Sequence, residues 1–201
     1  MKITRVEGTA LPMRGDDIDT DRIMPARYLR AVTFEGLEQH VFEDERAGSA
    51  AGSRTSAVHP FDNPSYRGAS ILLVNRNFGS GSSREHAPQA LQRAGFRAIL
   101  GESFAEIFFG NSLMIGLPCV TASPDEVREL MERVEERPEV RLRINLEAAT
   151  CEMDGFRCAI TLPGHARDAL VTGTWDTTAM LLNRYEEVDR IAARLPYVTG
   201  F

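Results

Sequence analysis

The residues with the clearest chemical potential in this chain lie at 77–91, with the sequence NFGSGSSREHAPQAL. Gly79 and Gly81 allow a sharp turn and a close approach of the backbone to a ligand. Successive backbone N–H groups in such a loop, at the start of a helix, form a concave anion site. The pattern therefore predicts an anion site, and a plain strand-to-helix turn capped by Ser82, with Glu85 closing a capping box, fits the same residues.

The residue types available exclude several other chemistries. Lys2 is the only lysine, so the chain has none to place deep in a phosphate-binding P-loop or in a Schiff-base site. Gly81 occupies the central position that a G-x-S-x-G nucleophile elbow gives to serine, which disfavours hydrolase chemistry. His86 has the residue type of an acid–base group, and we favour a structural role in which it holds the loop by hydrogen bonds.

A second candidate segment is the acidic stretch GDDIDTDRI at 15–23, in which aspartates alternate: Asp17, Asp19 and Asp21. A calcium loop would need glycine and glutamate where Arg22 and Tyr28 stand, so the segment predicts an acidic turn. Just beyond it, Arg27 and Arg30 bracket Tyr28 and a leucine. These arginines suit either a carboxylate clamp or a solvated basic patch.

The chain has three cysteines, Cys119, Cys151 and Cys158. Their odd number does not suggest a disulfide framework, and the absence of a C-x-x-C pair disfavours a conventional zinc or iron–sulfur site. The dipeptide Asp154-Gly155 predicts a type I′ hairpin turn. Counting outward from that turn pairs Cys151 with Cys158 on adjacent strands. We expect two small apolar side chains packed on one face of the hairpin.

Composition sets the broad class. The 201 residues carry a formal charge of −6 with no basic run, which argues against nucleic acid and anionic membranes as partners. The longest apolar runs, such as ILLV, are too short to cross a bilayer, and the first residues lack the apolar core of a signal peptide. The expected location is the cytoplasm.

The elements that must position these residues alternate between strand and helix, which predicts an α/β fold with parallel pairing. We expect an opening strand within 2–12 and a helix at 103–111 capped by Ser103. Residues 43–58 read as a mobile surface loop. The other expected elements are strands at 69–76, 96–100 and 117–121, an amphipathic helix at 123–137, β structure over 140–163, and a C-terminal helical segment at 176–195 that stops before Pro196.

Three motifs in this order resemble one family. They are DIDTDRIMPARYL at 17–29, NFGSGSSREHAP at 77–88 and GFRAILGESFAEIF at 95–108. Together they resemble the small subunits of 3-isopropylmalate dehydratase, the swivel domain of the aconitase superfamily. The resemblance spans residues 10–185, and its G-S-S-R-E-H motif is highly specific.

The resemblance implies one swivelling β/β/α domain over residues 1–201, with a partly parallel central sheet and flanking helices. It also implies a large partner subunit that holds a [4Fe–4S] cluster, in a heterodimer or a higher hetero-oligomer, with no cofactor bound by this chain. The implied reaction is the isomerisation of 2-isopropylmalate and 3-isopropylmalate by dehydration and rehydration, in leucine biosynthesis.

Residue roles follow from the same resemblance, motif by motif. Ser82 matches the base of the superfamily, while Ser83 and Arg84 match the residues that bind a substrate carboxylate and stabilise that base. Asp21 matches the aspartate that supports the site. Arg30 lies in the segment that selects the substrate side chain.

Two other functions remain open at this stage. Arg30 also suits a substrate with an additional carboxylate, as in a homoaconitase or a citramalate-type isomerase subunit. A swivel module that binds a carboxylate ligand without catalysis is the alternative from a different class.

Overall fold

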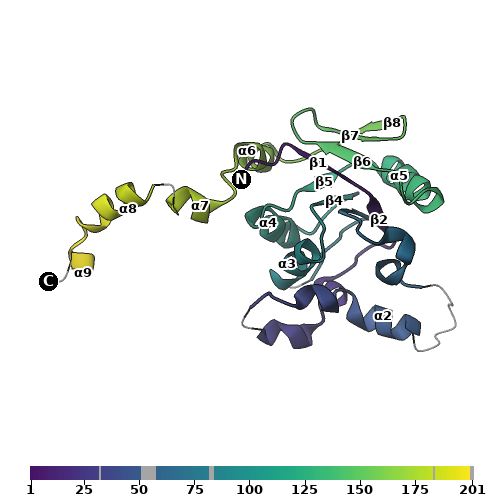
Figure 1. The fold of residues 1–201 in the computed structure, drawn as a ribbon, viewed down its shortest axis with the longest axis horizontal. Helices are drawn as coiled ribbons and strands as arrows, with labels where there is room; N and C mark the ends of the chain where they lie inside the picture. Colours follow the sequence, from purple (N-terminus) through teal and green to yellow (C-terminus); the bar gives the residue numbers. More distant parts are fainter. Residues whose placement is uncertain (32, 51–57, 82–83, 183, 200–201) are drawn as a thin grey trace.

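The structure is a computed structural model that describes residues 1–31, 33–50, 58–81, 84–182 and 184–199 (Figure 1). Its body contains two four-stranded sheets. The parallel sheet has the order β2-β3-β4-β5, with bounds Ala10–Met13, Ile71–Val74, Ala98–Gly101 and Cys119–Thr121. The antiparallel sheet has the order β1-β6-β7-β8, with bounds Arg5–Gly8, Leu142–Asn145, Thr150–Met153 and Phe156–Ala159.

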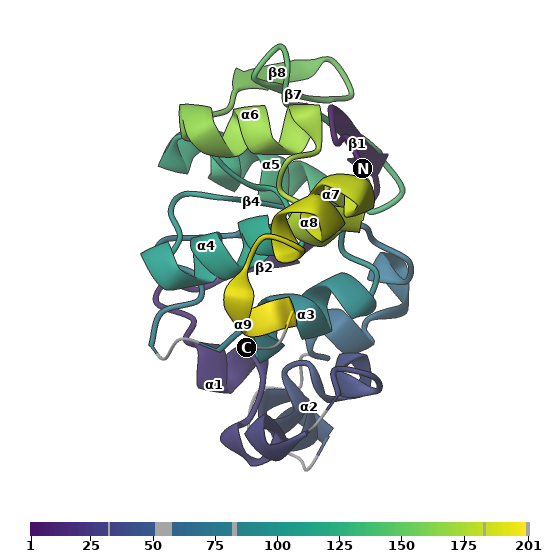
Figure 2. The same ribbon diagram turned by 90° about the vertical axis from the view of Figure 1, so that its left-hand side faces the viewer.

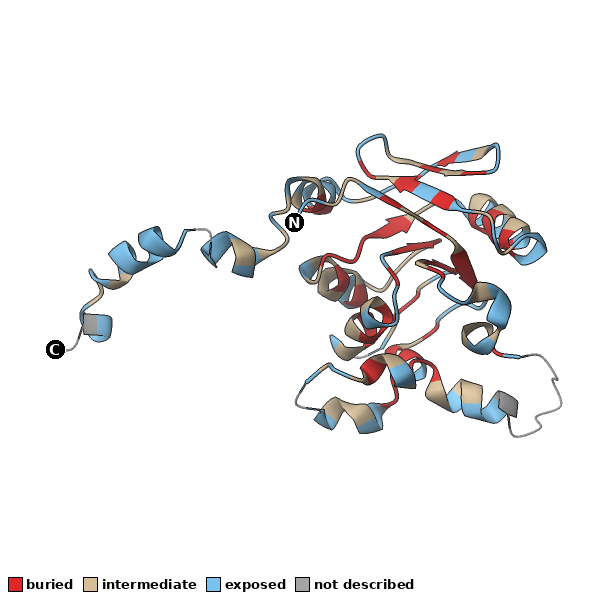
Figure 3. Ribbon diagram, viewed as in Figure 1, coloured by how far each residue is buried: buried red, intermediate tan, exposed pale blue. Residues whose placement is uncertain are grey.

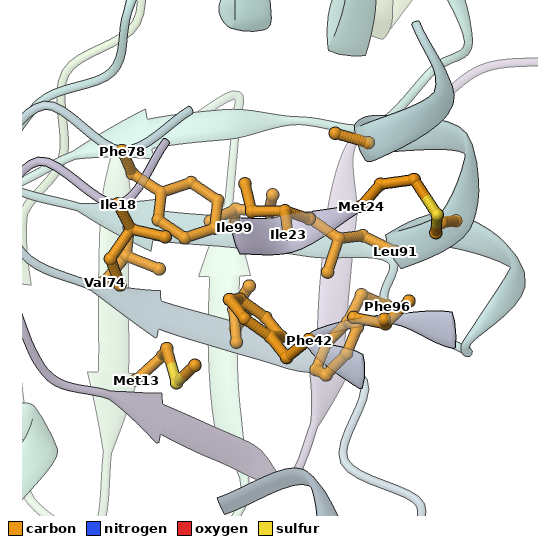
Figure 4. Close-up of a cluster of buried hydrophobic side chains, with 14 of the residues drawn as sticks. Met13, Ile18, Ile23, Met24, Phe42, Val74, Phe78, Leu91, Phe96 and Ile99 are labelled. Carbon is orange, nitrogen blue, oxygen red and sulfur yellow. The ribbon is translucent and has the colours of Figure 1, made fainter. Parts of the chain in front are cut away.

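The parallel sheet is buried on both faces, as its continuous apolar strands predict. Alternate residues of β3 point into different cores: Leu72 and Val74 enter one, and Ile71 and Leu73 the other. The first core lies under α1, α3 and α4, and Figure 4 shows its packed side chains, including Phe42. The second lies between the two sheets and α5. In Figure 3 the strands and helix segments that contribute to the two cores are coloured as buried, and the outer parts of the helices as exposed.

Helices flank these sheets and an arm leaves the body at the C-terminus (Figure 1). The α-helices of the body are α1 Thr20–Ile23, α2 Glu43–Ala50, α3 His86–Arg93, α4 Glu106–Met114, α5 Pro124–Glu136 and α6 Gly164–Thr172. Short 3₁₀ helices span Ala26–Arg30, Leu37–His40, Pro60–Asp62 and Pro64–Tyr66. The arm contains α7 Thr177–Leu182, α8 Tyr185–Ala192 and α9 Pro196–Thr199.

The elements defined by local rules are confirmed. Helix α5 begins with the capping box of Ser123 and Glu126 and buries the apolar stripe that its spacing predicts. The hairpin β7–β8 turns at Asp154 and Gly155, both with positive φ, and pairs Cys151 with Cys158. The α/β class with a partly parallel sheet is confirmed, whereas the extent of one swivel domain over 1–201 stays a prediction.

Several details differ from the expectations. The expected strand at 2–12 is two strands in different sheets, and part of the expected loop at 43–58 is helix α2; residues 51–57 lie outside the described residues. Helix α6 was not predicted. The C-terminal helical segment is divided into α7 and α8, and α8 ends at Ala192, before Pro196 as expected. The separate short helix α9, which was not expected, begins at Pro196; proline is well tolerated in a first helical turn, where its missing N–H has no partner to lose.

Ser103 does not cap α4, which begins at Glu106 without a side-chain cap. Its Oγ instead accepts a hydrogen bond of 2.8 Å from the backbone N–H of Asn77. Helix α3 begins at His86, so Pro88 falls in its first turn, where a missing N–H breaks no helical hydrogen bond. Within the described ranges, no helix is long and apolar enough to cross a membrane.

Candidate active site

The acidic segment and the serine-rich loop, about sixty residues apart in sequence, lie against each other. Three backbone hydrogen bonds join them: Asp17 N–H to Arg76 O at 2.9 Å, Gly79 N–H to Ile18 O at 2.7 Å, and Thr20 N–H to Ser80 O at 2.8 Å. Ile18 is fully buried in the first core and anchors this junction. The two motifs of the resemblance therefore form one structural unit.

Side chains add to this junction. Asn77 and Asp17 both have φ of 55°, and the Asn77 amide donates to Asp17 Oδ1 at 2.8 Å. Asparagine and aspartate tolerate this left-handed conformation better than other non-glycine residues. A second pair, Arg76 with Asp16 at 3.2 Å, lies at the exposed edge.

Gly79 is required by both conformation and space. Its φ is +78°, and a Cβ at this position would lie 2.2 Å from a ring carbon of Phe108 on α4. Gly81 also has a positive φ, of +93°. The prediction that these glycines allow a sharp turn is confirmed.

The turn is followed by a cation that is almost removed from water. The Arg84 side chain is only 14% exposed, and its Nη1 forms an ion pair with Oδ1 of Asp21. Arg84 Nε is buried and has no hydrogen-bond partner among the described residues. A buried donor without an acceptor is costly, so this guanidinium has capacity for a further anionic oxygen.

Asp21 presents its carboxylate from the first turn of α1. Asp19 caps this helix, since its Oδ1 accepts from the backbone N–H of Arg22 at 2.8 Å. An acidic side chain in the first turn is also favoured by the helix dipole. The short helix α1 thus directs Asp21 toward Arg84, and the side chain of Asp21 stays 53% exposed.

A charged cluster behind α1 was missed by the sequence analysis. Arg22 Nε lies 2.5 Å from Glu45 Oε1 on α2, and His59 Nε2 lies 3.5 Å from Glu45 Oε2. His59 Nδ1 accepts a hydrogen bond of 3.2 Å from the backbone N–H of Phe61, which leaves Nε2 to face Glu45. The close contact with His59 and the pairing with Arg22 lower the pKa of Glu45 to about 2.

The two arginines of the following segment behave differently. Arg27 pairs with Glu43 at 2.6 Å and with Asp44 at 2.8 Å, so it is not available as a carboxylate clamp. Arg30 is exposed at the end of its 3₁₀ helix. No hydrogen bond or ion pair joins it to Asp21 in the described part of the chain, and its role in selecting the substrate stays a prediction.

Ser82 and Ser83 lie outside the described residues, so their assigned roles stay predictions. His86 is half-buried, and its ring packs edge-on against Phe34 at 5.1 Å between centroids. Its Nε2 is buried without a hydrogen-bond partner among the described residues. The expectation that His86 holds the loop by hydrogen bonds stays a prediction as well.

The cysteines do not fit an iron–sulfur cluster. Cys151 and Cys158 face each other in the core between the sheets, whereas Cys119 belongs to the core on the other side of the parallel sheet. Burial raises the pKa of Cys119 to about 12, and the contact with Cys158 together with burial raises that of Cys151. Cluster ligands are thiolates gathered around one cluster, whereas these three cysteines are buried and divided between two cores.

A hollow of about 320 Å³ over the antiparallel sheet is another charged feature of the body. Its arginines are paired with Glu7 or Glu152, and their side chains are about half exposed or more: Arg141, Arg143 and Arg157. Exposed pairs of this kind are a solvated charged surface. They leave the junction of Asp21 and Arg84 as the better candidate site.

Comparisons with known proteins give the family of this chain. Residues 1–124 match the family described as the aconitase C-terminal domain. A 3-isopropylmalate dehydratase small subunit from Thermus thermophilus is 50% identical over 196 residues, which cover 98% of this chain and 96% of the relative. The corresponding small subunit from Synechocystis is 44% identical over 98% of this chain and 96% of its own length.

A solved structure supports the fold. The crystal structure of a 3-isopropylmalate dehydratase from Methanocaldococcus jannaschii superimposes with a TM-score of 0.66 at 24% identity, covering 90% of this chain and 99% of that one. With the family match and near-complete coverage of its relatives, the chain belongs to the aconitase C-terminal domain family and, within it, to the 3-isopropylmalate dehydratase small subunits.

Proposed function

We propose that this chain is the small subunit of a heteromeric hydro-lyase that interconverts 2-isopropylmalate and 3-isopropylmalate in leucine biosynthesis, in the cytoplasm. The observation that carries the proposal is Arg84, a nearly buried cation with an unpartnered Nε, next to Asp21 and the glycine turn. A malate-type acid brings a carboxylate of matching charge. Near-complete alignment with the Thermus small subunit supports the same assignment.

In the proposed reaction, Arg84 binds a substrate carboxylate through the guanidinium donors that Asp21 does not use. Asp21 holds the guanidinium in place with a charge-assisted contact. Since a planar guanidinium presents several donors in a fixed geometry, this pair fixes the orientation of the bound acid. The carbon that loses its proton is adjacent to such a carboxylate and is therefore only weakly acidic.

Ser82 takes that proton in the proposed mechanism. A free hydroxyl holds its own proton too tightly at neutral pH, so its oxyanion must be stabilised by nearby positive charge and by exclusion of water. In this proposal Arg84, two residues after Ser82, supplies the positive charge. Loss of the proton and of hydroxide gives an unsaturated acid, and addition of water in the opposite orientation gives the isomer.

The leaving hydroxyl requires a Lewis acid, which a [4Fe–4S] cluster supplies in the proposed large subunit. The three cysteines of this chain are buried and divided between two cores, so they do not fit that cluster. The chain's own contribution is the carboxylate clamp, the base and the closing surface.

Replacing Ser82 by Ala tests the base. Turnover of 2-isopropylmalate by the complex with the large subunit is expected to fall by at least about a thousandfold, since the proton acceptor is lost. Ser65→Ala, in a 3₁₀ helix remote from the turn, is the matched control and should keep full activity. Unchanged turnover in Ser82→Ala complexes would refute the assignment.

The substrate is tested by comparing kcat/KM for isopropylmalate, homocitrate and citramalate. Isopropylmalate is expected to be the best of the three. Arg30→Ala should change the ratios of kcat/KM between the three substrates more than it changes kcat/KM for the best substrate, because the proposed role of Arg30 is to select the substrate side chain. A preference for homocitrate would assign the chain to the homoaconitase alternative, and binding without turnover of any acid would favour the non-catalytic module.

A further inference from the structure

The C-terminal arm, residues 177–199, exposes apolar side chains that no described part of the chain covers. Figure 1 shows it projecting from the body, and Figure 3 shows its helices as mostly exposed. No residue of α7 or α8 that the structure describes is buried. The apolar side chains exposed along the arm are Met180, Leu181, Leu182, Tyr185, Val188, Ile191, Tyr197 and Val198.

This exposure follows a helical pattern. In α8, Tyr185, Val188 and Ile191 recur at three-residue spacing, so they share one side of the helix. Acidic and basic residues border them: Arg184, Glu186, Glu187 and Arg190 line a hollow with Leu182 and Tyr185. An apolar stripe with a charged rim has the composition of a protein interface.

Helix α4 presents a second apolar strip. Ile107 is 49% exposed and Met114 is 73% exposed, and they are seven residues apart, two helical turns along the same side. Phe108 and Ser112 are buried on another side of the same helix. Of the twelve large apolar side chains that the described residues expose, ten lie on α4 or on the arm.

Helix α4 connects the candidate site to the base of the arm. Near its start, the Phe108 side chain closes on Gly79 of the serine-rich turn. Just after its end, Gly116 lies against the Trp175 ring, where an added Cβ would meet the ring at 2.6 Å. Trp175 is fixed to the body by a hydrogen bond of 2.9 Å from Nε1 to Met1 O. Figure 2 views this side directly, with α3, α4 and the arm turned toward the reader.

We propose that the arm and the outer side of α4 form one docking surface for the cluster-bearing large subunit. This inference rests on the proposed function, in which the large subunit must cover the turn at Gly79 and Arg84. A protein that seals this turn meets Ile107 on α4 next, and Met114 leads from there toward the arm. The surface thus continues from the site that the partner has to close.

A lipid surface or a second copy of the chain would explain less of the exposed apolar surface on the arm and α4. A lipid surface would favour basic residues around the apolar stripe, whereas the border of α8 contains Glu186, Glu187 and Asp189 beside Arg190. Pairing of two arms from two copies would cover the stripe of α8 and leave Ile107 and Met114 exposed. The large subunit accounts for both parts of the surface.

The test measures the dissociation constant of the full-length chain for the purified large subunit from the same organism. Leu182→Glu on the arm and Met114→Glu on α4 are each expected to raise it at least tenfold. Val58→Glu, an equally exposed apolar position outside this surface, is the matched control and should stay within twofold. Circular dichroism checks folding, and Leu182→Ala and Met114→Ala serve as milder variants.

The outcomes separate this inference from the proposed function. Unchanged dissociation constants in both glutamate variants would overturn the docking surface. So would variants that alter only the sedimentation of the isolated chain, since the arm would then pair with a second copy. If the variants weaken binding but the wild-type complex converts no malate-type acid, the docking surface stands and the proposed reaction fails.

Discussion

Two glycine turns of this chain have nearly the same backbone conformation in opposite surroundings. Gly79, in the candidate site, has φ of +78°, and Gly155, in the β7–β8 hairpin, has φ of +79°. A Cβ on Gly79 would enter the ring of Phe108, whereas nothing lies within 4 Å of the same position on Gly155. Gly79 is therefore constrained both by its positive φ and by the packing of Phe108, whereas Gly155 is constrained by its positive φ alone.

The arginines beside these turns differ in the same way. Arg84 is 14% exposed and keeps a buried donor without a partner in the described chain, while Arg143 near the hairpin is 49% exposed and paired with Glu7. Removing charge from water is expensive, and exposed ion pairs are worth little. A buried guanidinium with a donor left free is costly unless a ligand supplies the missing acceptor. The burial of Arg84 therefore distinguishes the candidate site from the exposed, paired arginines of the hairpin.

The largest expected difference between the two regions is in catalysis. Arg84→Ala should lower kcat/KM of the complex for isopropylmalate by about a hundred- to a thousandfold, because the carboxylate loses its charged partner. Arg84→Lys should recover only part of this loss, since an ammonium lacks the planar set of donors. Steady-state kinetics on the reconstituted complex measure both.

Arg143→Ala is the control for this comparison and should stay within twofold of the wild-type value. Asp21 is half exposed, so loss of Arg84 leaves no buried unpaired carboxylate, and the variant is expected to fold. Equal losses in Arg84→Ala and Arg143→Ala would mean that burial does not mark the site.

The next difference is in stability. Gly79→Ala is expected to lower the free energy of unfolding by about 3 kcal/mol, from overpacking against Phe108 and an unfavourable positive φ. Gly155→Ala has only the conformational cost, about 1 kcal/mol. Urea unfolding of the isolated chain measures both, and similar losses in the two variants would contradict the contrast between the turns.

Much of the hairpin was predictable because its rules are local. Asp154-Gly155 specifies the turn, and counting outward sets the register that pairs Cys151 with Cys158. The capping box of Ser123 and Glu126 likewise predicts the start of α5. These signals lie within a few residues of the structure that they define.

The first strands show where such rules stop. The alternation within 2–12 correctly indicated extended chain, but β1 and β2 belong to different sheets. The reason is tertiary: Gly8 packs so closely on Ser70 that a Cβ would lie 1.8 Å from its Oγ, and β2 continues beside β3. Nothing in the local pattern specifies which sheet a strand joins.

The candidate site was predictable in part. Its two motifs were recognised from the resemblance, and the structure brings Asp21 and Arg84 together. The cluster of Arg22, Glu45 and His59 was not predicted from the sequence. These three come from separate segments, and a single sequence has no signal for their pairing.

The smallest expected difference concerns that cluster and its dependence on pH. The pKa of Glu45 is about 2 in the folded chain, below its usual 4.5, so its ionised form stabilises the fold. This stabilisation is present above pH 4.5 and is lost as the pH falls from 4.5 toward 2. Glu45→Gln should therefore destabilise the chain by about 1 kcal/mol at pH 7 and have progressively less effect in acid.

Glu7 at the hairpin is the matched control for Glu45. Arg143 and Arg141 also lower the pKa of Glu7, but these partners are 49% and 61% exposed, whereas Glu45 contacts the buried His59. Salt screens exposed pairs much more than partly buried ones. Urea unfolding in 1 M salt should therefore abolish the effect of Glu7→Gln and retain that of Glu45→Gln. If salt removed both effects equally, the charged cluster behind α1 would be no better shielded than the hairpin surface, and the contrast between the two regions would be confined to Arg84.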